Sequence, residues 1–353
     1  MTFDLPQTWA EQPVGMRDVY PEQAKYRRDI ESKLLAFFEQ HGYHMVSSGA
    51  FEYVDTLLRG RQVQEADDWL RWFDPNGRMV ALRPDMTPSI ARMAAPLVAS
   101  GTKEIRWCYA EKVFRRSNDP ASLSWVSGKA AESTQVGVEW IGPAANRADV
   151  DLLALCQRSV EHLGLADWQM VVSHAKLTAS LLEVLGLSQE ARETLMQYLI
   201  RGDYVGFRQV HADYGITEDV LGALAQVNPL DHGSLSAFLT YSREDNPTTQ
   251  RVWKLWDELT EFASVLAVQG LTEHLSFDFT LTRDLSYYTG IIFEVFVPGV
   301  GAPVALGGRY DDLLAQFGSP APAVGFTFEV ERLLTALTDG RWLAESMGKG
   351  DVR

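Results

Sequence analysis

The spacing of hydrophobic and polar positions along this chain changes from strand-like to helix-like and back again. Short apolar runs that suit β-strands occur in about the first 145 residues and again in about the last 80. Between about residue 167 and residue 270, leucines recur mainly at helical spacing. Because the strands are grouped and do not alternate regularly with helices, the pattern predicts an α+β fold with an antiparallel-type sheet and a helical insertion.

Individual elements are predicted from period, caps and turn residues. One helix is expected to begin at Pro21 and to end at Gly42, because proline suits a first helical turn and glycine a helix end. A second helix is expected from Thr87 to about Ala99. The other predicted helices are 146–164 and 329–337, and the predicted strands are 44–53, 79–85, 104–115, 134–141, 169–174, 275–283, 290–298 and 323–328.

The same change of spacing predicts how the chain divides into domains. Residues 1–166 and 271–340 are expected to form the core, a sheet flanked by helices. Residues 167–270 are expected to form a mainly helical insertion, and residues 341–353 a C-terminal tail. Leucines of the insertion suit either a buried core or an interface, and their spacing alone does not distinguish the two.

Composition supports a folded protein and disfavours a nucleic-acid partner. Hydrophobic residues make up 46% of the 353 residues, which is enough for a sizeable core. The formal net charge is −15. Because non-specific binding to nucleic acid depends on lysine and arginine neutralising phosphates, we expect no nucleic-acid partner for an acidic chain that has no run of basic residues.

Several other classes of protein are disfavoured by motifs that the sequence lacks. Cys108 and Cys156 are expected to be buried thiols in a reducing, cytoplasmic compartment. The seven histidines are scattered and form no metal-binding motif, so no metal is expected. There is no glycine-rich phosphate loop, and we expect no cofactor. No signal peptide and no apolar run long enough for a bilayer are recognised, so we expect no membrane partner.

Two short segments in the last quarter of the chain carry the most specific chemistry. Arg283, Tyr287 and Tyr288 lie in the first, LTRDLSYYTGIIFE, and Tyr310 lies in the second, ALGGRYDDL. A guanidinium pairs with a carboxylate, and phenols hydrogen-bond to a polar side chain, so the two segments predict a pocket for a small zwitterion. The alternative is a strand edge with one cation and two amphipathic aromatics, which so short a motif does not exclude.

Four further positions bear on the predicted site, and three of them have more than one interpretation. Glu139 lies in an otherwise apolar predicted strand, and a buried carboxylate needs a partner, so we expect it to contribute to the site. Asp85 suits either the cap of the helix that follows it or a ligand contact, and the two roles are compatible. Gly307 and Gly308 are expected to form a tight turn close to the ligand, although a turn alone would explain them.

The two C-terminal segments resemble the histidine-recognition motifs of histidyl-tRNA synthetases. Further stretches resemble other motifs of that family, in the same order. They are GMRDVYP (15–21), LRPDMTP (82–88), CYAEKVFR (108–115) and QVGVEWIG (135–142), the last two being the strands of class II motif 2, and GFTFEVERL (325–333), which resembles motif 3. The resemblance covers roughly residues 10 to 337 and implies the fold of a class II aminoacyl-tRNA synthetase.

The resemblance also implies a complete pocket for the amino acid. Asp85, Thr87 and Gln135 correspond to the side of the site that holds the amino group. Glu139 corresponds to the acid that contacts the imidazole, and Arg283 to the arginine that faces the carboxylate. Phenols from the two C-terminal segments line the imidazole. The full histidine-binding set that the resemblance implies is Asp85, Thr87, Arg115, Gln135, Glu139, Arg283, Tyr287, Tyr288 and Tyr310.

The nucleotide half of the site departs from the synthetase pattern. Ser133 stands where synthetases have the phenylalanine that stacks on adenine, and Glu329 replaces a small glycine beside adenine. A carboxylate in that place adds bulk and repels a triphosphate. Arg115 and Arg332 match arginines of the pattern, but two arginines alone do not make an ATP site. We therefore expect no catalytic residue.

The chain also has little length after motif 3. About sixteen residues follow Leu337, so no C-terminal anticodon-binding domain is expected. In these respects the chain is similar to a family of truncated synthetase paralogues, the regulatory subunits of short-form ATP phosphoribosyltransferases. That resemblance implies a non-enzymatic protein of histidine biosynthesis, with the catalytic subunit as its partner and L-histidine as its allosteric ligand. It also implies a homodimer within a hetero-oligomer.

Two other functions are compatible with parts of the sequence. A synthetase-derived ligase that adenylates an amino acid would use the same pocket, but it requires ATP. A module that binds structured RNA is disfavoured by the acidic charge.

Overall fold

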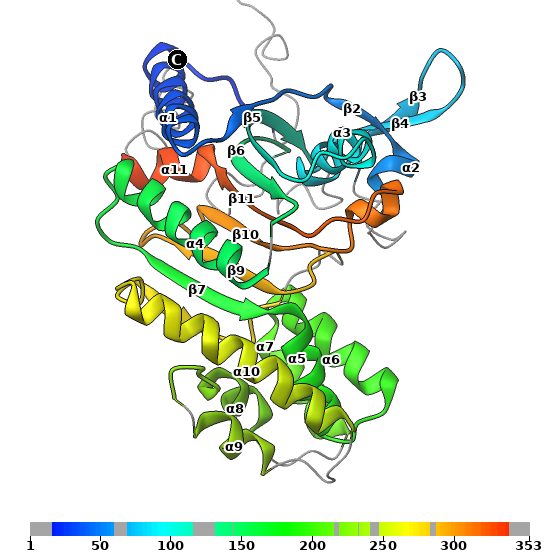
Figure 1. The fold of residues 1–353 in the computed structure, drawn as a ribbon, viewed down its shortest axis with the longest axis vertical. Helices are drawn as coiled ribbons and strands as arrows, with labels where there is room; N and C mark the ends of the chain where they lie inside the picture. The colour runs from blue at the N-terminus through cyan, green and yellow to red at the C-terminus, as the bar shows by residue number, and fades with distance from the viewer. Residues whose placement is uncertain are drawn as a thin grey trace, which may run out of the picture.

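An eight-stranded sheet forms the centre of the molecule. The computed structural model describes residues 16–59, 69–115, 131–143, 145–214, 219–231, 233–240, 247–282 and 287–338. The strand order of the sheet is β1-β5-β6-β11-β10-β9-β7-β8, so β6 and β11, which are far apart in the chain, are neighbours (Figure 1). The strands are β1 His44–Met45, β5 Ile105–Phe114, β6 Glu132–Ile141, β7 Gln169–His174, β8 Leu275–Phe277, β9 Ile291–Phe296, β10 Ala305–Arg309 and β11 Ala323–Glu329.

Strand directions agree with the predicted fold class. From β5 to β7 in the sheet order, every strand pairs antiparallel with its neighbours. At the two edges β1 pairs parallel with β5, and β8 pairs parallel with β7. Each of these edge pairs is joined by a long connection that includes helices, as parallel strands require, and not by a hairpin. The α+β prediction is confirmed, with a sheet that is mixed at its edges.

Helices cover both faces of the sheet. On one face, α1 (Pro21–Gln40) contacts β5 and β6, α4 (Ala145–His162) contacts β11, and α11 (Val330–Leu337) contacts β6. On the other face, α3 (Thr87–Ala99) packs with the short helix η4 (Leu314–Phe317). The first three helices lie to the left of the strands in Figure 1 and α3 lies to the right. Each face therefore has its own buried cluster of side chains.

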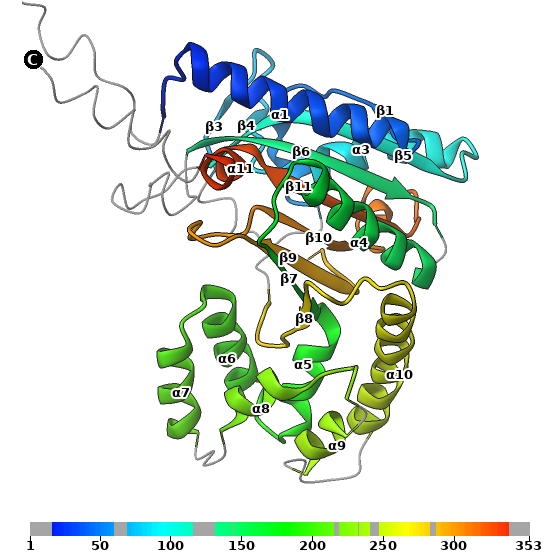
Figure 2. The same ribbon diagram turned by 90° about the vertical axis from the view of Figure 1, so that its left-hand side faces the viewer.

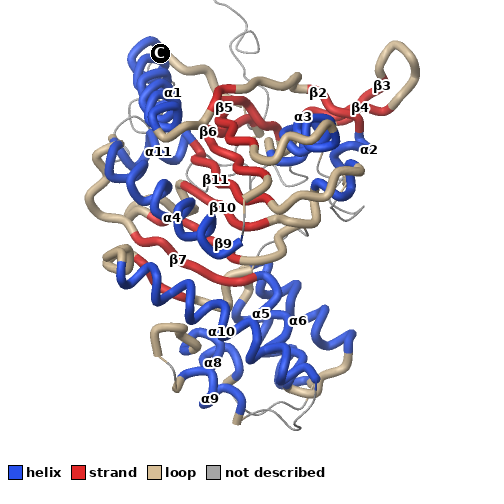
Figure 3. The backbone as a smooth tube through the Cα atoms, viewed as in Figure 1, coloured by secondary structure: helices blue, strands red, loops and turns tan. Residues whose placement is uncertain are grey.

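A group of helices lies beyond β7, away from α1. Figure 2 shows this group below the sheet, as Figure 1 does, and Figure 3 shows that helices predominate there while the strands lie above. The helix α10 contacts both α5 and α4 and so links the group to the sheet. The domain boundaries remain a prediction, but β7, within the predicted insertion, belongs to the main sheet. The helices are α5 Ala175–Val184, α6 Gln189–Arg201, α7 Tyr204–Asp213, α8 Val220–Gln226, α9 Ser234–Leu239 and α10 Pro247–Val268.

A smaller sheet has the strand order β2-β4-β3. Its elements are β2 Phe51–Tyr53, the short helix α2 Val54–Leu57, β3 Arg71–Phe73 and β4 Met79–Leu82. The single strand predicted over 44–53 is therefore wrong, because β1 and β2 belong to different sheets. The guanidinium of Arg83, which is 1% exposed, donates to the carbonyl oxygens of Ser48 and Gly49 at 2.9 and 3.0 Å. In a continuous strand these carbonyl groups would accept hydrogen bonds from a neighbouring strand. Here they accept from the Arg83 side chain instead.

The turn predicted at Gly307 and Gly308 is also wrong. Both residues lie inside β10, which pairs with β9 on one side and with β11 on the other. A Cβ atom on Gly307 would lie 2.5 Å from the carbonyl oxygen of Gly325, and one on Gly308 would lie 2.4 Å from that of Ile291. Glycine is required here because neighbouring groups approach closely, and not because the chain turns.

Two other predicted elements have the predicted ends, and a third is shorter than predicted. The helix α3 and the strand β7 have the predicted bounds. The strand predicted over 275–283 stops at Phe277, because Asp278 Oδ1 accepts hydrogen bonds from the N–H and hydroxyl of Thr280 and turns the chain. Hydrophobic spacing does not predict the short elements α2, β3 and β10. Of the helices described, none is long and apolar enough to cross a membrane.

Candidate functional site

Glu139 of β6 is at the centre of the candidate site, on the face of the sheet that α3 covers. Its side chain is almost fully buried, with 1% exposure. The hydroxyl of Tyr310 donates a hydrogen bond to Oε2 of Glu139. The hydroxyls of Thr87 and Tyr109 donate to Oε1 at 3.0 and 3.4 Å. One acid is therefore held by hydroxyl groups from β5, from the start of α3 and from the end of β10.

Burial changes the ionisation of this group of side chains. It raises the pKa of Glu139 to about 7, and the hydrogen bonds from Tyr310, Thr87 and Tyr109 offset that rise only in part. The pKa values of Tyr109 and Tyr310 lie well above their usual range, first because of burial and then because of the nearby charge of Glu139. Near neutral pH both forms of Glu139 are populated, so it can accept a hydrogen bond from an imidazole or share a proton with it.

Glycines leave the space that Glu139 and its neighbours occupy. A Cβ atom on Gly325, opposite Glu139 in the sheet, would lie 1.8 Å from Oε2 of Glu139. A Cβ atom on Gly137 would lie 2.7 Å from the hydroxyl oxygen of Tyr109. Sequence reasoning did not single out Tyr109 or Gly325 as site residues. Both lie in segments that resemble synthetase motifs, and strand alternation places Tyr109 on the same face as Glu139.

Asp85 and Gln135 organise the start of α3. Asp85, which is buried, accepts a hydrogen bond at Oδ1 from the backbone N–H of Thr87 at 2.7 Å. The N-cap position itself belongs to Met86, whose backbone N–H donates to Oε1 of Gln135 at 3.3 Å. Asp85 is therefore not the N-cap of α3, but its local hydrogen bond orders the turn before the helix, beside the Thr87 hydroxyl that reaches Glu139.

Three tyrosines form the aromatic wall of the site. Tyr287 is 4% exposed and meets Tyr310 edge to face, with ring centroids 5.9 Å apart. Tyr288 is half-buried, and its ring centroid lies 4.9 Å from that of Tyr287. Tyr310 contacts the ring of Tyr287 and donates a hydrogen bond to Glu139, so the three rings lie in the same region as the acid. Arg283, the remaining predicted member of this segment, lies outside the described residues.

Glu329 takes part in a second buried polar group. Its carboxylate accepts a hydrogen bond from Nη2 of Arg115 at 3.2 Å and from Nε2 of Gln135 at 3.0 Å. Burial alone would raise the pKa of Glu329, but the charges of Arg115 and Arg332, with hydrogen bonds from Gln135 and Ser133, lower it to about 2. The side chain is therefore a permanent internal anion at physiological pH.

The predicted site residues fall into two groups along β6. Glu139 is opposite Gly325 in β11, whereas Gln135 is opposite Glu329. Four strand residues span about 13 Å, so the two groups are separated by roughly that distance along the strand. Arg115, which was predicted to belong to the histidine pocket, lies at the Glu329 end. Gln135 hydrogen-bonds to both Glu329 and the backbone N–H of Met86, the residue before α3.

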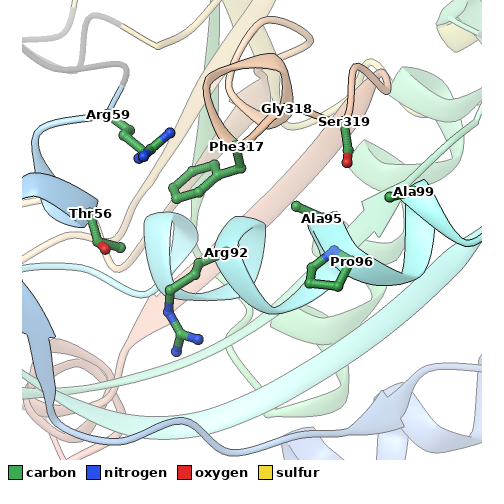
Figure 4. Close-up of a pocket in the computed structure, with 9 residues that line it drawn as sticks. All are labelled: Thr56, Arg59, Arg92, Ala95, Pro96, Ala99, Phe317, Gly318 and Ser319. Carbon is green, nitrogen blue, oxygen red and sulfur yellow. The ribbon is translucent and has the colours of Figure 1, made fainter.

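A different pocket, of about 450 Å³, lies between α2, α3 and η4 (Figure 4). It contains none of the predicted site residues. The guanidinium of Arg59 lies 5.2 Å from the ring centroid of Phe317, and Nη2 of Arg92 lies 2.8 Å from Oε1 of Glu52. The residues that line it are Thr56, Arg59, Arg92, Ala95, Pro96, Ala99, Phe317, Gly318 and Ser319.

Neither a metal centre nor a disulfide is found in the described ranges. No group of three or more histidine, cysteine, aspartate or glutamate side chains there is arranged to hold a metal ion. Cys108 and Cys156 are free and buried, as predicted, and burial raises the pKa of both thiols. A thiol that resists ionisation is a poor nucleophile, so both residues have the properties of core side chains.

Comparison with known proteins gives a consistent set of relatives. The family model of histidyl-tRNA synthetases matches residues 15–333. An ATP phosphoribosyltransferase regulatory subunit from Moorella thermoacetica is 36% identical over 324 residues, which cover 92% of this chain and 81% of that protein. A protein of the same description from Symbiobacterium thermophilum is 34% identical over 348 residues, covering 98% of this chain and 84% of the relative.

Solved structures resemble the whole described fold. A structure described as a histidine–tRNA ligase subunit from Alicyclobacillus acidocaldarius is 45% identical, with a TM-score of 0.83, and the match covers 94% of this chain and 98% of that one. A structure described as an ATP phosphoribosyltransferase regulatory subunit/histidyl-tRNA synthetase from Bacillus halodurans is 28% identical, with a TM-score of 0.78, covering 95% and 84%. The histidyl-tRNA synthetase of Nostoc, at 17% identity and a TM-score of 0.75, shares the fold.

Proposed function

This chain belongs to the family of ATP phosphoribosyltransferase regulatory subunits, which have the histidyl-tRNA synthetase domain, and on that premise we propose that it regulates a separate catalytic subunit. In this proposal it activates a short-form ATP phosphoribosyltransferase and mediates feedback inhibition by L-histidine. It acts in the cytoplasm as a homodimer within a hetero-oligomer. The descriptions of the relatives support the partner, and the buried polar pocket supports the ligand.

The observation that carries the choice of ligand is the buried acid surrounded by hydroxyl groups. An imidazole has one N–H donor and one acceptor nitrogen in its neutral form. Glu139 can accept from the N–H. The hydroxyls of Tyr109 and Tyr310 each have one proton, which they donate to Glu139 in the ligand-free protein, so in this proposal one of them turns its proton to the other nitrogen when the ligand binds. A site that satisfies both nitrogens rejects apolar rings of the same shape, because those rings would leave its buried polar groups unpaired.

A non-catalytic role is supported by the Glu329 group. A nucleotide that bound there would meet a buried carboxylate whose pKa is held at about 2, and Arg115 already pairs with that carboxylate. The charge of Glu329 opposes a triphosphate and occupies the arginine that would otherwise bind one. Histidine is thus the expected ligand without being a substrate of this chain.

Regulation then follows from unequal binding to two states of the complex. If histidine binds more tightly when the catalytic subunit is inactive, it shifts the population toward that form. Coupling energies of this kind are typically about 1–3 kcal/mol, which corresponds to a change of about 5- to 150-fold in affinity.

The decisive experiment measures phosphoribosyltransferase activity of the short-form catalytic subunit with and without this chain. We expect the chain to raise the activity and L-histidine to lower it. Replacing Glu139 by Gln should weaken the inhibition by about tenfold or more, because the negative charge is lost and one of the two acceptor oxygens becomes an amide donor. Glu190→Gln, on the exposed face of α6, is the matched control and should behave as the wild type.

Two results would count against this proposal in different ways. If the wild-type chain leaves the activity of the catalytic subunit unchanged, the regulatory role is wrong. If histidine still inhibits equally well with Glu139→Gln, the inhibitor binds elsewhere, for instance where the subunits meet.

A second candidate is an ATP-dependent amino-acid ligase. It is favoured by the retention of Arg115 and Arg332 and by the description of the Alicyclobacillus structure as a ligase subunit. Such an enzyme would catalyse histidine-dependent exchange of pyrophosphate into ATP. We expect no exchange from the purified chain, because Glu329 opposes the nucleotide. Exchange above the level without histidine would make the ligase the better assignment.

A further inference from the structure

A cluster of buried charges lies behind the candidate site, on the opposite face of the sheet. Arg309, the last residue of β10, is 5% exposed, and Asp149 of α4 is 7% exposed. Nε of Arg309 lies 3.0 and 3.1 Å from the two carboxylate oxygens of Asp149, and Nη1 donates to Oδ1 of Asp311 at 2.9 Å. A buried arginine between two carboxylates is held in one position, because any movement would leave a buried charge unpaired.

The backbone around Arg309 is held just as closely. The carbonyl oxygen of Arg309 accepts from the N–H of Thr289 at 2.8 Å, and the Thr289 hydroxyl accepts from the N–H of Asp311 at 3.0 Å. The aliphatic part of the Arg309 side chain lies against Gly290, where an added Cβ atom would come within 2.9 Å of Cδ. Arg309 therefore joins β10 to the segment that follows Tyr288.

Arg309 and Tyr310 point to opposite sides of the sheet. Arg309 reaches Asp149 of α4, whereas Tyr310 packs in the cluster on the α3 face and donates to Glu139. Consecutive residues of an extended chain alternate in this way. Fixing the arginine on one face therefore fixes the direction of the tyrosine on the other.

We propose that Arg309, anchored by Asp149, is a positioning residue for the ligand pocket on the far side of the sheet. Its ion pair holds the end of β10 so that the Tyr310 hydroxyl meets Glu139, and it holds Thr289 so that Tyr287 and Tyr288 line the pocket. The inference rests on the proposed function, in which this pocket binds histidine. A loss of the ion pair moves the hydroxyl and the rings together, and misplacements of about 1 Å strongly weaken interactions that depend on geometry.

The cluster also borders a cleft of about 220 Å³ between the sheet and the helices α5 and α10. His174, which lines this cleft, accepts at Nδ1 from the backbone N–H groups of Lys176 and Leu177. Burial, with the charge of Lys176, lowers the pKa of His174 to about 4, so it is neutral at physiological pH. Lys176 and Glu258 also line the cleft, but both are exposed. Arg309 is buried, and it is the cation that pairs with Asp149.

The test is a double-mutant cycle on the purified full-length chain. Asp149→Asn and Arg309→Lys should each weaken L-histidine binding, measured by calorimetry, by about tenfold or more. In a Tyr310→Phe background the same changes should weaken binding clearly less than in the wild type, because one of the groups that they position, the Tyr310 hydroxyl, is already absent. Losses that simply add up would indicate general loosening of the fold and would overturn the inference.

The matched control is Arg92→Lys. It makes the same change in a second ion pair, between Arg92 and Glu52, in which Nη2 and Oε1 are 2.8 Å apart. This substitution should leave histidine binding unchanged. Thermal unfolding of every variant identifies proteins that fail to fold. If Asp149→Asn fails to fold, Arg309→Lys serves as the test, because it keeps the positive charge that pairs with Asp149.

A second measurement separates this inference from the proposed function. The carbon-13 resonance of the Tyr310 ring carbon that carries the hydroxyl reports its hydrogen bond to Glu139, with or without histidine, and Tyr310→Phe assigns it. We expect Arg309→Lys to shift this resonance and Arg92→Lys to leave it in place. If the wild type binds no histidine, the proposed function fails while the resonance still tests the positioning role. If neither resonance nor affinity changes in a folded Arg309→Lys protein, the inference is wrong.

Discussion

At the scale of single residues, the chemistry of the site depends on how burial acts on each carboxylate. Glu139, in β6, and Glu329, in the neighbouring strand β11, are both 1% exposed. Burial raises the pKa of the first to about 7, because its partners are neutral hydroxyl groups whose hydrogen bonds offset the rise only in part. The second is next to Arg115 and Arg332, so its pKa falls to about 2. Neighbouring charge, and not the degree of burial, therefore decides which carboxylate can respond to pH.

We expect Glu139 to make the stability of the protein depend on pH. Its folded-state pKa is about 7, above the ordinary value of 4.5. Its stabilising contribution is therefore fully present below about pH 4.5 and is lost as the pH rises through 7. Relative to Glu139→Gln, the wild type should lose about 1–3 kcal/mol of unfolding free energy over this range. Urea unfolding of both proteins between pH 4.5 and 8 measures the difference.

The comparison of wild type and variant also controls for other acids. Glu331 is buried too, with a pKa raised to about 7 mainly by burial, and it contributes equally to both proteins. Parallel stability curves for the two proteins would mean that Glu139 ionises normally in the folded state.

At the scale of elements, the close pairing of β6 with β11 limits which residues can occupy the strands. Gly325 is opposite Glu139, and an added Cβ atom would lie 1.8 Å from Oε2 of Glu139 and 2.7 Å from the carbonyl oxygen of Val138. The carbonyl group belongs to the backbone and cannot move aside without disturbing the sheet. The strand pair thus tolerates only glycine at this position.

Replacing Gly325 by alanine should lower the unfolding free energy by about 1–3 kcal/mol, because it overpacks a buried strand pair. It should also remove histidine binding by displacing the Glu139 carboxylate. Gly49→Ala is a suitable control, because its nearest contact would be an ordinary 3.8 Å, and we expect a change within about 0.5 kcal/mol. Urea unfolding and calorimetry check both effects, and equal stability of the two variants would contradict the steric argument.

Element ends were predictable where local signals decide them, and unpredictable where distant contacts do. The bounds of α3 follow from its own sequence, with Pro88 in the first turn. The break between β1 and β2 is set by Arg83, which is far from Ser48 in sequence. Its guanidinium donates to the carbonyl oxygen of Ser48 at 2.9 Å. Likewise, Gly307 and Gly308 suggest a turn in the sequence alone. The pairing of β10 with strands on both sides shows that they lie inside a strand.

At the scale of the whole molecule, the candidate site joins residues from distant parts of the chain: the start of α3, β5, β6 and the end of β10. A ligand that binds only the folded form stabilises the entire fold, by about 2.7 kcal/mol when its concentration is 100 times its dissociation constant. We therefore expect L-histidine to raise the thermal unfolding temperature by several degrees. Phenylalanine, which has a flat ring without nitrogens, should leave it unchanged.

Thermal unfolding with increasing concentrations of each amino acid measures this effect. Glu139→Gln should show a much smaller response to histidine, whereas Glu190→Gln, at an exposed position of α6, should respond as the wild type does. An equal response to histidine and phenylalanine would show that the pocket does not recognise the ring nitrogens.

The sequence by itself determined the fold class and most of the elements, and it predicted the region of the candidate site, because spacing and motif residues are local properties. Only the tertiary structure decided how the site residues are grouped. The pairing of β6 with β11 brings Gln135 within 3.0 Å of Glu329, although 194 residues separate them, and Arg115 joins that pair and not Glu139. Which side chains face each other depends on strand register and on which face each residue takes, and neither is visible in a local pattern.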